Sequence, residues 1–172
     1  MGGAVHLTRR FFGSLLPGGP PEADRAWVES VLSEAEYGLW RRQYGPDRRH
    51  TVQVAREVER RLGNEATSPV LAAALLHDIG KIDADLGTWG RVVATMSAKV
   101  AGRDTAKLWI KSSGFTRRVG LYLHHPEIGA DMLELAGSDP LTVAWAEEHH
   151  KPAEQWTIDP AIAQVLHEVD DD

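Results

Sequence analysis

The apolar positions along the chain follow a helical period almost everywhere. Between residues 47 and 62, Val54, Ala55 and Val58 form one stripe at about 100° per residue, and His50 lies on its edge, one turn before Val54. No segment alternates between apolar and polar residues for long enough to predict a strand. The pattern therefore predicts an all-α fold.

Turn and capping residues divide this pattern into consecutive helices. Ser33 and Glu36 have the spacing of a capping box, and Gly63 ends the helix of residues 47–62. Residues 85–123 predict two amphipathic helices, split near Gly102, before a further helix begins near Thr116. A cap or a proline marks each of the later helix starts, at Ser68 with Pro69, at Pro126, at Ser138 or Asp139 with Pro140, and at Pro160.

The stretch VLAAALLHDIGK, residues 70–81, joins seven apolar residues directly to an adjacent histidine and aspartate. We expect His77 and Asp78 to occupy the last turn of this helix before Gly80 ends it. Charged groups at the end of a buried segment are unfavourable unless other polar groups meet them. The structural alternative is that the pair only caps the helix. In that case the helix dipole would favour a protonated His77, and Asp78 would accept a hydrogen bond from a backbone amide of the turn.

Composition limits the class of protein. The chain has 172 residues, 42% of them hydrophobic, and no internal repeat, so we expect one domain over residues 1–172 with an N-terminal arm at 1–20. Its 19 basic and 25 acidic residues give a net charge of -6, which argues against a nonspecific nucleic-acid coat or binding to an anionic membrane. The first residues contain only brief apolar pairs, so we expect no signal peptide or membrane span and a cytoplasmic location.

A set of polar residues at helix ends and on inward faces supplies imidazoles and carboxylates. Because the chain has no cysteine, thiolate ligands are excluded. Mixed nitrogen and oxygen ligands suit divalent Mn, Fe, Zn, Ni or Co better than Mg or Ca. We therefore expect a metal-binding core over residues 47–170, with candidate ligands His50, His77, Asp78, His125, His149, His150 and Asp170.

Some of these assignments remain open at this point. Either His124 or His125 can face the pocket, although Pro126 is expected to push His125 out of helical geometry. His149 shares a helix face with Leu141 and Trp145, which also fits an ordinary core histidine, and His150 also fits a helix cap. Asp170 continues the apolar stripe of the last helix, whereas Asp171 lies opposite it.

The order of His50, the His77–Asp78 pair and Asp170 resembles the H…HD…D pattern of the HD-domain superfamily of metal-dependent phosphohydrolases. The segments HHPEIGADML and WAEEHHKP are similar to the extra histidine segments of its HD-GYP branch. This resemblance, over residues 47–170, implies an HD-domain helical bundle. It also implies a dinuclear metal site in which Asp78 bridges the two metals.

The chain also departs from that branch. Its last histidine pair continues as HHKPAEQW, without the Gly-Tyr-Pro signature, so cleavage of cyclic di-GMP is not implied. Pro46 stands where some relatives carry an acidic ligand for a third metal, which indicates two metals at most. Residues 85–123 are longer than the matching segment of that branch.

The leading functional hypothesis is hydrolysis of a small phosphorylated substrate, a nucleotide or another phosphate ester, by a metal-activated water. Lys81, one turn beyond His77, is placed to pair with phosphate oxygens. Alternatively, Lys81 is an ordinary surface lysine at a helix end.

Two other functional hypotheses stay open. The same ligand set resembles that of HD-fold mixed-valence di-iron oxygenases, and some HD-related domains are noncatalytic regulatory modules.

Overall fold

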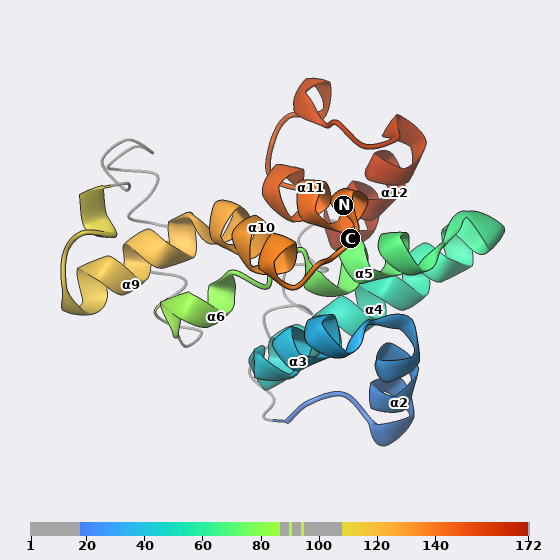
Figure 1. Cartoon of the computed structure of the whole chain (residues 1–172), viewed down its shortest axis with the longest axis horizontal. Helices are drawn as coiled ribbons and strands as arrows, with labels where there is room; N and C mark the ends of the chain where they lie inside the picture. The colour runs from blue at the N-terminus through green and yellow to red at the C-terminus, as the bar shows by residue number, and fades with distance from the viewer. Residues whose placement is uncertain (1–17, 87–89, 91–93, 95–107, 172) are drawn as a thin grey trace, which may run out of the picture.

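The computed structural model describes residues 18–86, 90, 94 and 108–171, and every regular element in these ranges is helical, which confirms the all-α prediction (Figure 1). The predicted arm at residues 1–20 and the predicted helices near Gly102 fall largely outside the described residues. The α-helices are α2 (Glu22–Val31), α3 (Glu34–Arg42), α4 (Gly45–Leu62), α5 (Ser68–Leu76), α6 (Lys81–Ala84), α9 (Gly114–Leu123), α10 (His125–Leu135), α11 (Pro140–Glu148) and α12 (Pro160–Asp171), with short 3-10 turns η1 (Gly63–Glu65) and η2 (Ala153–Gln155).

Helix α5 is the centre of the bundle (Figure 1). Every residue of α5 from Val70 to Leu76 is buried, and a helix that is apolar on all sides is stable only when neighbours surround it. Helices α4 and α11 pack directly on α5, while α12 packs on α4 and α10 packs along α11. A smaller apolar cluster joins α6 to α9 through Ala84, Val119 and Leu121.

Polar side chains cap one helix and join other helices to each other. The capping box at the start of α3 is present as predicted: Ser33 N–H donates to Glu36 Oε2 at 2.9 Å, and Glu36 N–H donates to Ser33 Oγ at 3.3 Å. The indole of Trp40 donates to Thr51 Oγ1 at 3.3 Å, which joins α3 to α4. On the other side of α5, Thr142 Oγ1 donates to the Pro69 carbonyl at 3.0 Å, which joins α11 to α5.

The prediction that His77 and Asp78 form the last helical turn was wrong by a few residues. Helix α5 ends at Leu76, and the chain then forms tight turns in which Ile79 N–H donates to the Leu76 carbonyl at 2.9 Å and Lys81 N–H donates to the Asp78 carbonyl at 3.0 Å. His77 itself keeps helical dihedral angles and donates its N–H to the Ala73 carbonyl at 3.0 Å, so it is the C-cap of α5. Helix α5 also begins with Thr67 as its cap, one residue before the predicted Ser68.

The predicted break at His125 lies at His124 instead. His124 has φ -106° and ψ 18°, and its N–H is shared between the carbonyls of Gly120 and Leu121, each at 3.2 Å. His125 is the first residue of α10, where Pro126 lies in the first turn and needs no helical hydrogen bond. The sequence left Ser138 and Asp139 as alternative caps for α11. Asp139 is the cap, and its side chain accepts a hydrogen bond from Leu141 N–H at 2.9 Å.

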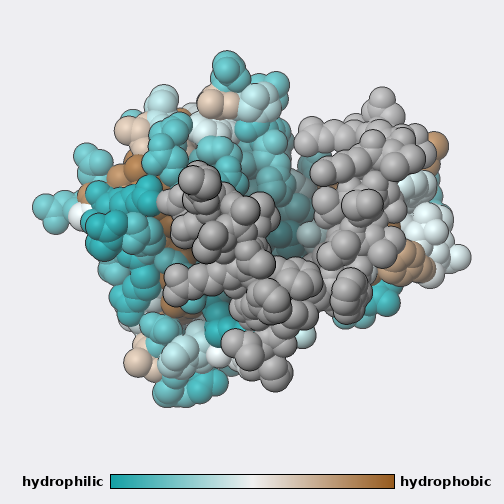
Figure 2. Space-filling view, turned by 180° about the vertical axis from the view of Figure 1, so that it is seen from behind, coloured by the Kyte–Doolittle hydropathy of each residue, from teal (hydrophilic) through white to brown (hydrophobic). Residues whose placement is uncertain are grey.

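The surface is mostly polar. Seen from behind, the described residues present a largely hydrophilic face with small apolar patches only (Figure 2). Within the described parts of the chain, no helix combines the length and the apolar character needed to cross a membrane.

The turn after α5 packs directly on the backbone of α10. A Cβ added at Gly80 would lie 2.0 Å from the His125 carbonyl oxygen and 2.7 Å from the Gly129 nitrogen, so only glycine fits at this crossing. Gly129 lies on the other side of the same contact. A Cβ added at Gly129 would lie 3.1 Å from the Gly80 nitrogen, which is also close. This close approach fixes the distance between the His77–Asp78 turn and His125.

We expect Gly80→Ala to destabilise the fold by about 2 kcal/mol or more, because the methyl group must push α10 away. Gly38, exposed in the middle of α3 with nothing near its added Cβ, provides the matched control. Gly38→Ala is expected to stabilise the protein by about 0.5–1 kcal/mol through helix propensity. Urea unfolding of both variants measures the difference, and equal midpoints for Gly80→Ala and the parent protein would contradict the packing argument.

Candidate metal centre

Five helices bring the predicted ligands together around the buried end of α5. His50 lies on α4, the His77–Asp78 pair follows α5, His125 opens α10, and Asp170 lies near the end of α12. His149 and His150 follow α11. Their potential ligand atoms form two groups, each with all atoms within 4.8 Å of one another: Asp78, His125, His149 and His150 in one, and His50, His77 and Asp170 in the other.

The Asp78 carboxylate lies between the two groups. Its Oδ1 is 3.1 Å from His125 Nε2 and 3.6 Å from His149 Nε2. Its Oδ2 is 3.5 Å from His77 Nε2 and contacts Lys81 Nζ. One carboxylate thus faces the first group with one oxygen and the second group with the other.

The second group is built around Asp170. Its Oδ1 lies 2.9 Å from His50 Nε2 and 3.5 Å from His77 Nε2. The His77 ring meets the His50 ring edge-on, with centroids 6.1 Å apart, and meets the His149 ring edge-on at 5.2 Å. The two groups are therefore parts of one continuous cluster.

Backbone carbonyls orient three of the histidines in the same way. His77 Nδ1 donates to the Ala74 carbonyl at 3.0 Å, and His149 Nδ1 donates to the Ala146 carbonyl at 2.9 Å. His125 Nδ1 likewise donates at 2.7 Å to the carbonyl three residues earlier, in the last turn of α9. A carbonyl oxygen can only accept, so each Nδ1 carries a hydrogen, and the neutral ring then has its lone pair on Nε2, aimed at the cluster.

The atoms that face the centre of the cluster lack hydrogen-bond partners. Buried Nε2 atoms of His77, His125 and His149 and Oδ1 of Asp78 have none within the described residues. Leaving such groups unpaired in the interior is unfavourable. Two ligand atoms that share one cation at about 2.1 Å lie about 3.0–3.4 Å apart. The separations of 2.9–3.6 Å found here match that spacing, so the residues present fit divalent cations.

Charge within the cluster is strongly coupled. Burial by itself would raise the pKa of Asp78, but the Lys81 ammonium and His77 outweigh it and hold that pKa well below its usual range. Burial would likewise lower the pKa of His77, yet the Asp170 and Asp78 carboxylates raise it to about 10. Asp170 has a lowered pKa because His77 and His50 outweigh its burial. The two carboxylates therefore favour positive charge at His77.

Lys81 belongs to the cluster and is not a surface lysine. It is the first residue of α6, its side chain is 16% exposed, and its ammonium contacts Asp78 Oδ2. Burial would lower the pKa of Lys81, but the Asp78 carboxylate outweighs burial and raises it, so the amine is charged. Lys81 Nζ also lies 5.8 Å from the centre of the Tyr122 ring.

The structure separates the neighbouring residues that sequence reasoning left open. His125 is in the cluster, whereas His124 Nδ1 lies 3.7 Å from Glu127 Oε2. Asp170 is in the cluster, whereas Asp171 pairs with His167 at 3.3 Å. His149 is buried and His150 is exposed at the rim, with ring centroids 4.0 Å apart.

Sequence reasoning missed Glu148, a buried carboxylate at the end of α11. Its two oxygens accept from Thr157 N–H at 2.7 Å and from Thr157 Oγ1 at 2.8 Å. This contact pins the loop of residues 149–157 to the helix that precedes it. The sequence could have indicated its burial. Glu148 lies three residues after Trp145 and seven after Leu141, so it shares their inward helix face.

Comparison with known protein families matches residues 48–170 to the HD domain. Neither the curated proteins nor the solved structures contain a match to the chain. The matched range covers more than half of the sequence and holds all seven clustered residues. The chain belongs to the HD-domain superfamily.

Proposed function

We propose that this protein is a metal-dependent phosphohydrolase that acts on a nucleotide or another small phosphate ester. The HD-domain superfamily contains many metal-dependent hydrolases together with noncatalytic members, so membership alone does not decide between them. The observation that carries the proposal is the packing of His77, Asp78, His125 and His149 in one cluster, where imidazole Nε2 atoms lie 3.1–3.6 Å from the Asp78 oxygens without forming hydrogen bonds.

The proposed site holds two divalent cations of Mn, Fe, Zn, Ni or Co. One would be held by His50, His77 and Asp170, and the other by His125, His149 and His150, with Asp78 shared between them. The contacts of Asp78 Oδ1 and Oδ2 with opposite sides of the cluster support this bridging role. Bound cations of this kind polarise phosphoryl oxygens and lower the pKa of water, which supplies the nucleophile.

The chain's own residues hold this chemistry in place. The carbonyls of Ala74, Tyr122 and Ala146 keep three imidazoles in the tautomer that presents Nε2. These carbonyls lie in the last turns of α5, α9 and α11, and the partial negative charge of helix C-termini favours cations nearby. The apolar α5 excludes water from the inner side of the cluster.

Lys81 favours phosphate chemistry over the oxygenase alternative. A charged, half-buried ammonium beside the proposed bridging carboxylate places positive charge where the phosphoryl oxygens of a substrate would gain negative charge. Activation of O₂ has no such requirement. In this role Lys81 binds the reacting phosphate, and Asp78 holds both the cations and the lysine.

Replacing the shared carboxylate tests the site. Asp78→Asn is expected to lose most bound metal and to reduce hydrolysis of a generic phosphodiester by about 10³-fold, because the amide removes the charge that both cation positions share. Elemental analysis of the purified protein gives the metal content, and a chromogenic diester gives the rate. His167→Gln, at a histidine outside the cluster, is the matched control and should keep both. Full metal content and activity in Asp78→Asn would refute the assignment.

Replacing Lys81 separates phosphate binding from metal binding. We expect Lys81→Gln to retain its metal but to lower kcat by about 10²-fold, because the positive charge acts mainly on the transition state. Lys151→Gln is the control, since Lys151 is partly exposed and pairs with Glu147 at 2.8 Å. If Lys81→Gln kept its full kcat, Lys81 would have only a structural role.

Metal binding is expected to release a proton. His77, with its pKa raised to about 10 in the metal-free protein, is protonated at pH 7.5 and must lose that proton to become a ligand. Metal affinity should therefore rise by about tenfold per pH unit between pH 7 and 9. Calorimetric titration with Mn²⁺ in two buffers of different ionisation enthalpy counts the protons, and a count of zero at pH 7.5 would contradict the coupling.

A further inference from the structure

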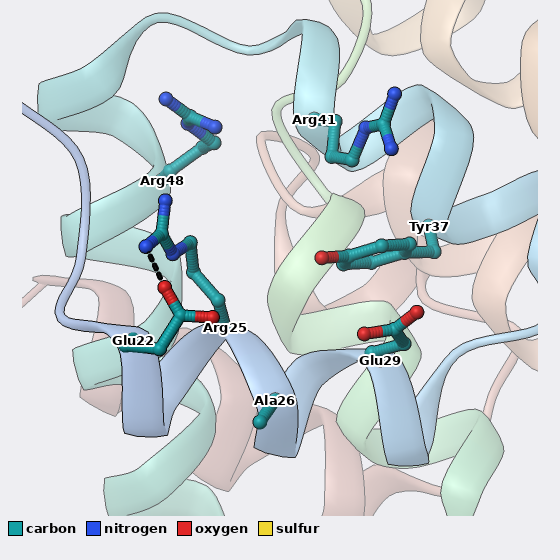
Figure 3. A pocket seen from close by; sticks show the side chains of 7 residues that line it. All are labelled: Glu22, Arg25, Ala26, Glu29, Tyr37, Arg41 and Arg48. Atoms are coloured by element: carbon teal, nitrogen blue, oxygen red, sulfur yellow. Dashed lines mark hydrogen bonds and ion pairs between the residues drawn. The ribbon is translucent and has the colours of Figure 1, made fainter.

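A second polar pocket lies away from the metal centre, between α2, α3 and the first turns of α4 (Figure 3). Its volume is about 360 Å³, within the range of small-molecule sites. In Figure 3 the Arg25 and Arg48 side chains lie on one side and Tyr37 and Arg41 on the other, with the Tyr37 hydroxyl pointing into the space between them. The polar residues that line it are Glu22, Arg25, Glu29, Tyr37, Arg41 and Arg48.

The charge of this pocket is opposite to that of the whole chain. Three guanidinium groups face two carboxylates, although the net charge of the protein is -6. Glu22 contacts Arg25 and neutralises it. Glu29 therefore remains against Arg41 and Arg48, and the pocket keeps an excess of one positive charge.

Arg41 and Arg48 are held by aromatic rings and not by carboxylates. The Arg41 guanidinium lies 5.8 Å from the centre of the Tyr37 ring, and that of Arg48 lies 5.6 Å from the centre of the Trp40 ring. Neither side chain forms an ion pair or hydrogen bond with another described residue, and Arg48 Nε is buried without an acceptor. Ring contacts orient a guanidinium but satisfy none of its N–H donors.

We propose that this pocket binds a phosphorylated small molecule, whose phosphate groups accept hydrogen bonds from Arg41 and Arg48. Guanidinium forks match phosphate oxygens in geometry and charge, and donors already oriented by aromatic rings lose little freedom on binding. The Tyr37 hydroxyl is a further donor on the same side as Arg41. Glu29 repels an anion and limits the affinity for phosphate alone.

The pocket is distinct from the proposed metal centre. Arg48 and His50 lie two residues apart on α4, which places them about 200° apart around the helix axis. Helices α2 and α3 contribute nothing to the metal cluster. The occupant would contact the first turns of the helix that carries His50 without reaching the reacting phosphate.

Calorimetric titration of the full chain with inorganic pyrophosphate tests the proposal. Arg41→Gln and Arg48→Gln should each weaken binding by about tenfold or more, since each removes charge-assisted hydrogen bonds. Glu29→Gln should strengthen binding by a few-fold, because it removes the repulsion. Arg60→Gln is the matched control: Arg60 lies on α4, is exposed and pairs with Glu57, so its loss should leave binding unchanged.

Two results would overturn the proposal. One is no pyrophosphate binding by the parent protein at millimolar concentration. The other is binding that Lys81→Gln abolishes while Arg41→Gln and Arg48→Gln leave it unchanged, which would locate pyrophosphate at the metal centre. Arg41 is exposed on α3, so Arg41→Gln is expected to fold even if Arg48→Gln does not, and thermal unfolding of each variant checks this.

Discussion

The burial of one carboxylate, that of Asp78, is the constraint on which the rest of the structure depends. A helix as apolar as α5 must lie inside the bundle, and Asp78, two positions after its end, is then largely shielded from solvent, with a side chain only 12% exposed. An isolated carboxylate in such a place would be protonated or would destabilise the fold. Here Lys81 and His77 hold its pKa low, and His125 and His149 complete its surroundings.

The helix arrangement follows from meeting this carboxylate from several sides. The C-terminal ends of α5, α9 and α11 all converge on the cluster, and each supplies a carbonyl that orients a histidine. Carbonyl ends of three helices add partial negative charge around a site already rich in carboxylates. Within the cluster, the Asp170 and Asp78 carboxylates outweigh burial and raise the pKa of His77 to about 10. On the side of the cluster that holds His77 and Asp170, the proposed metals would supply positive charge.

Helical periodicity was sufficient to predict the parts of the site that lie inside long helices. The stripe of α4 placed His50 on the inward edge, and the stripe of α12 separated Asp170 from Asp171; both residues lie where the phase indicates. Side chains at helix ends were harder to predict. The choice between His124 and His125 depends on where α9 stops, and this is set by a shared hydrogen bond of the His124 N–H that no residue pattern encodes.

Contacts between distant segments were beyond sequence reasoning for a different reason. From the sequence, Gly80 is predicted to end a helix. In the structure, glycine is required at this position because the α10 backbone, more than forty residues later in the chain, leaves no space for a Cβ. Glu148 shows the same limit, because its partner Thr157 lies across a loop with no periodicity. Both residues hold the histidines indirectly: Gly80 fixes the distance to His125, and Glu148 fixes the loop that begins with His149.

Helix α4 connects the two sites that the structure suggests. Its inward face carries His50, while its first turns present Arg48 to the pocket between α2 and α3. Arg48 packs on Trp40, whose indole donates to Thr51, the residue that follows His50. The two sites therefore share one helix and a short run of packed side chains, with Arg48 and His50 about 200° apart around the helix axis.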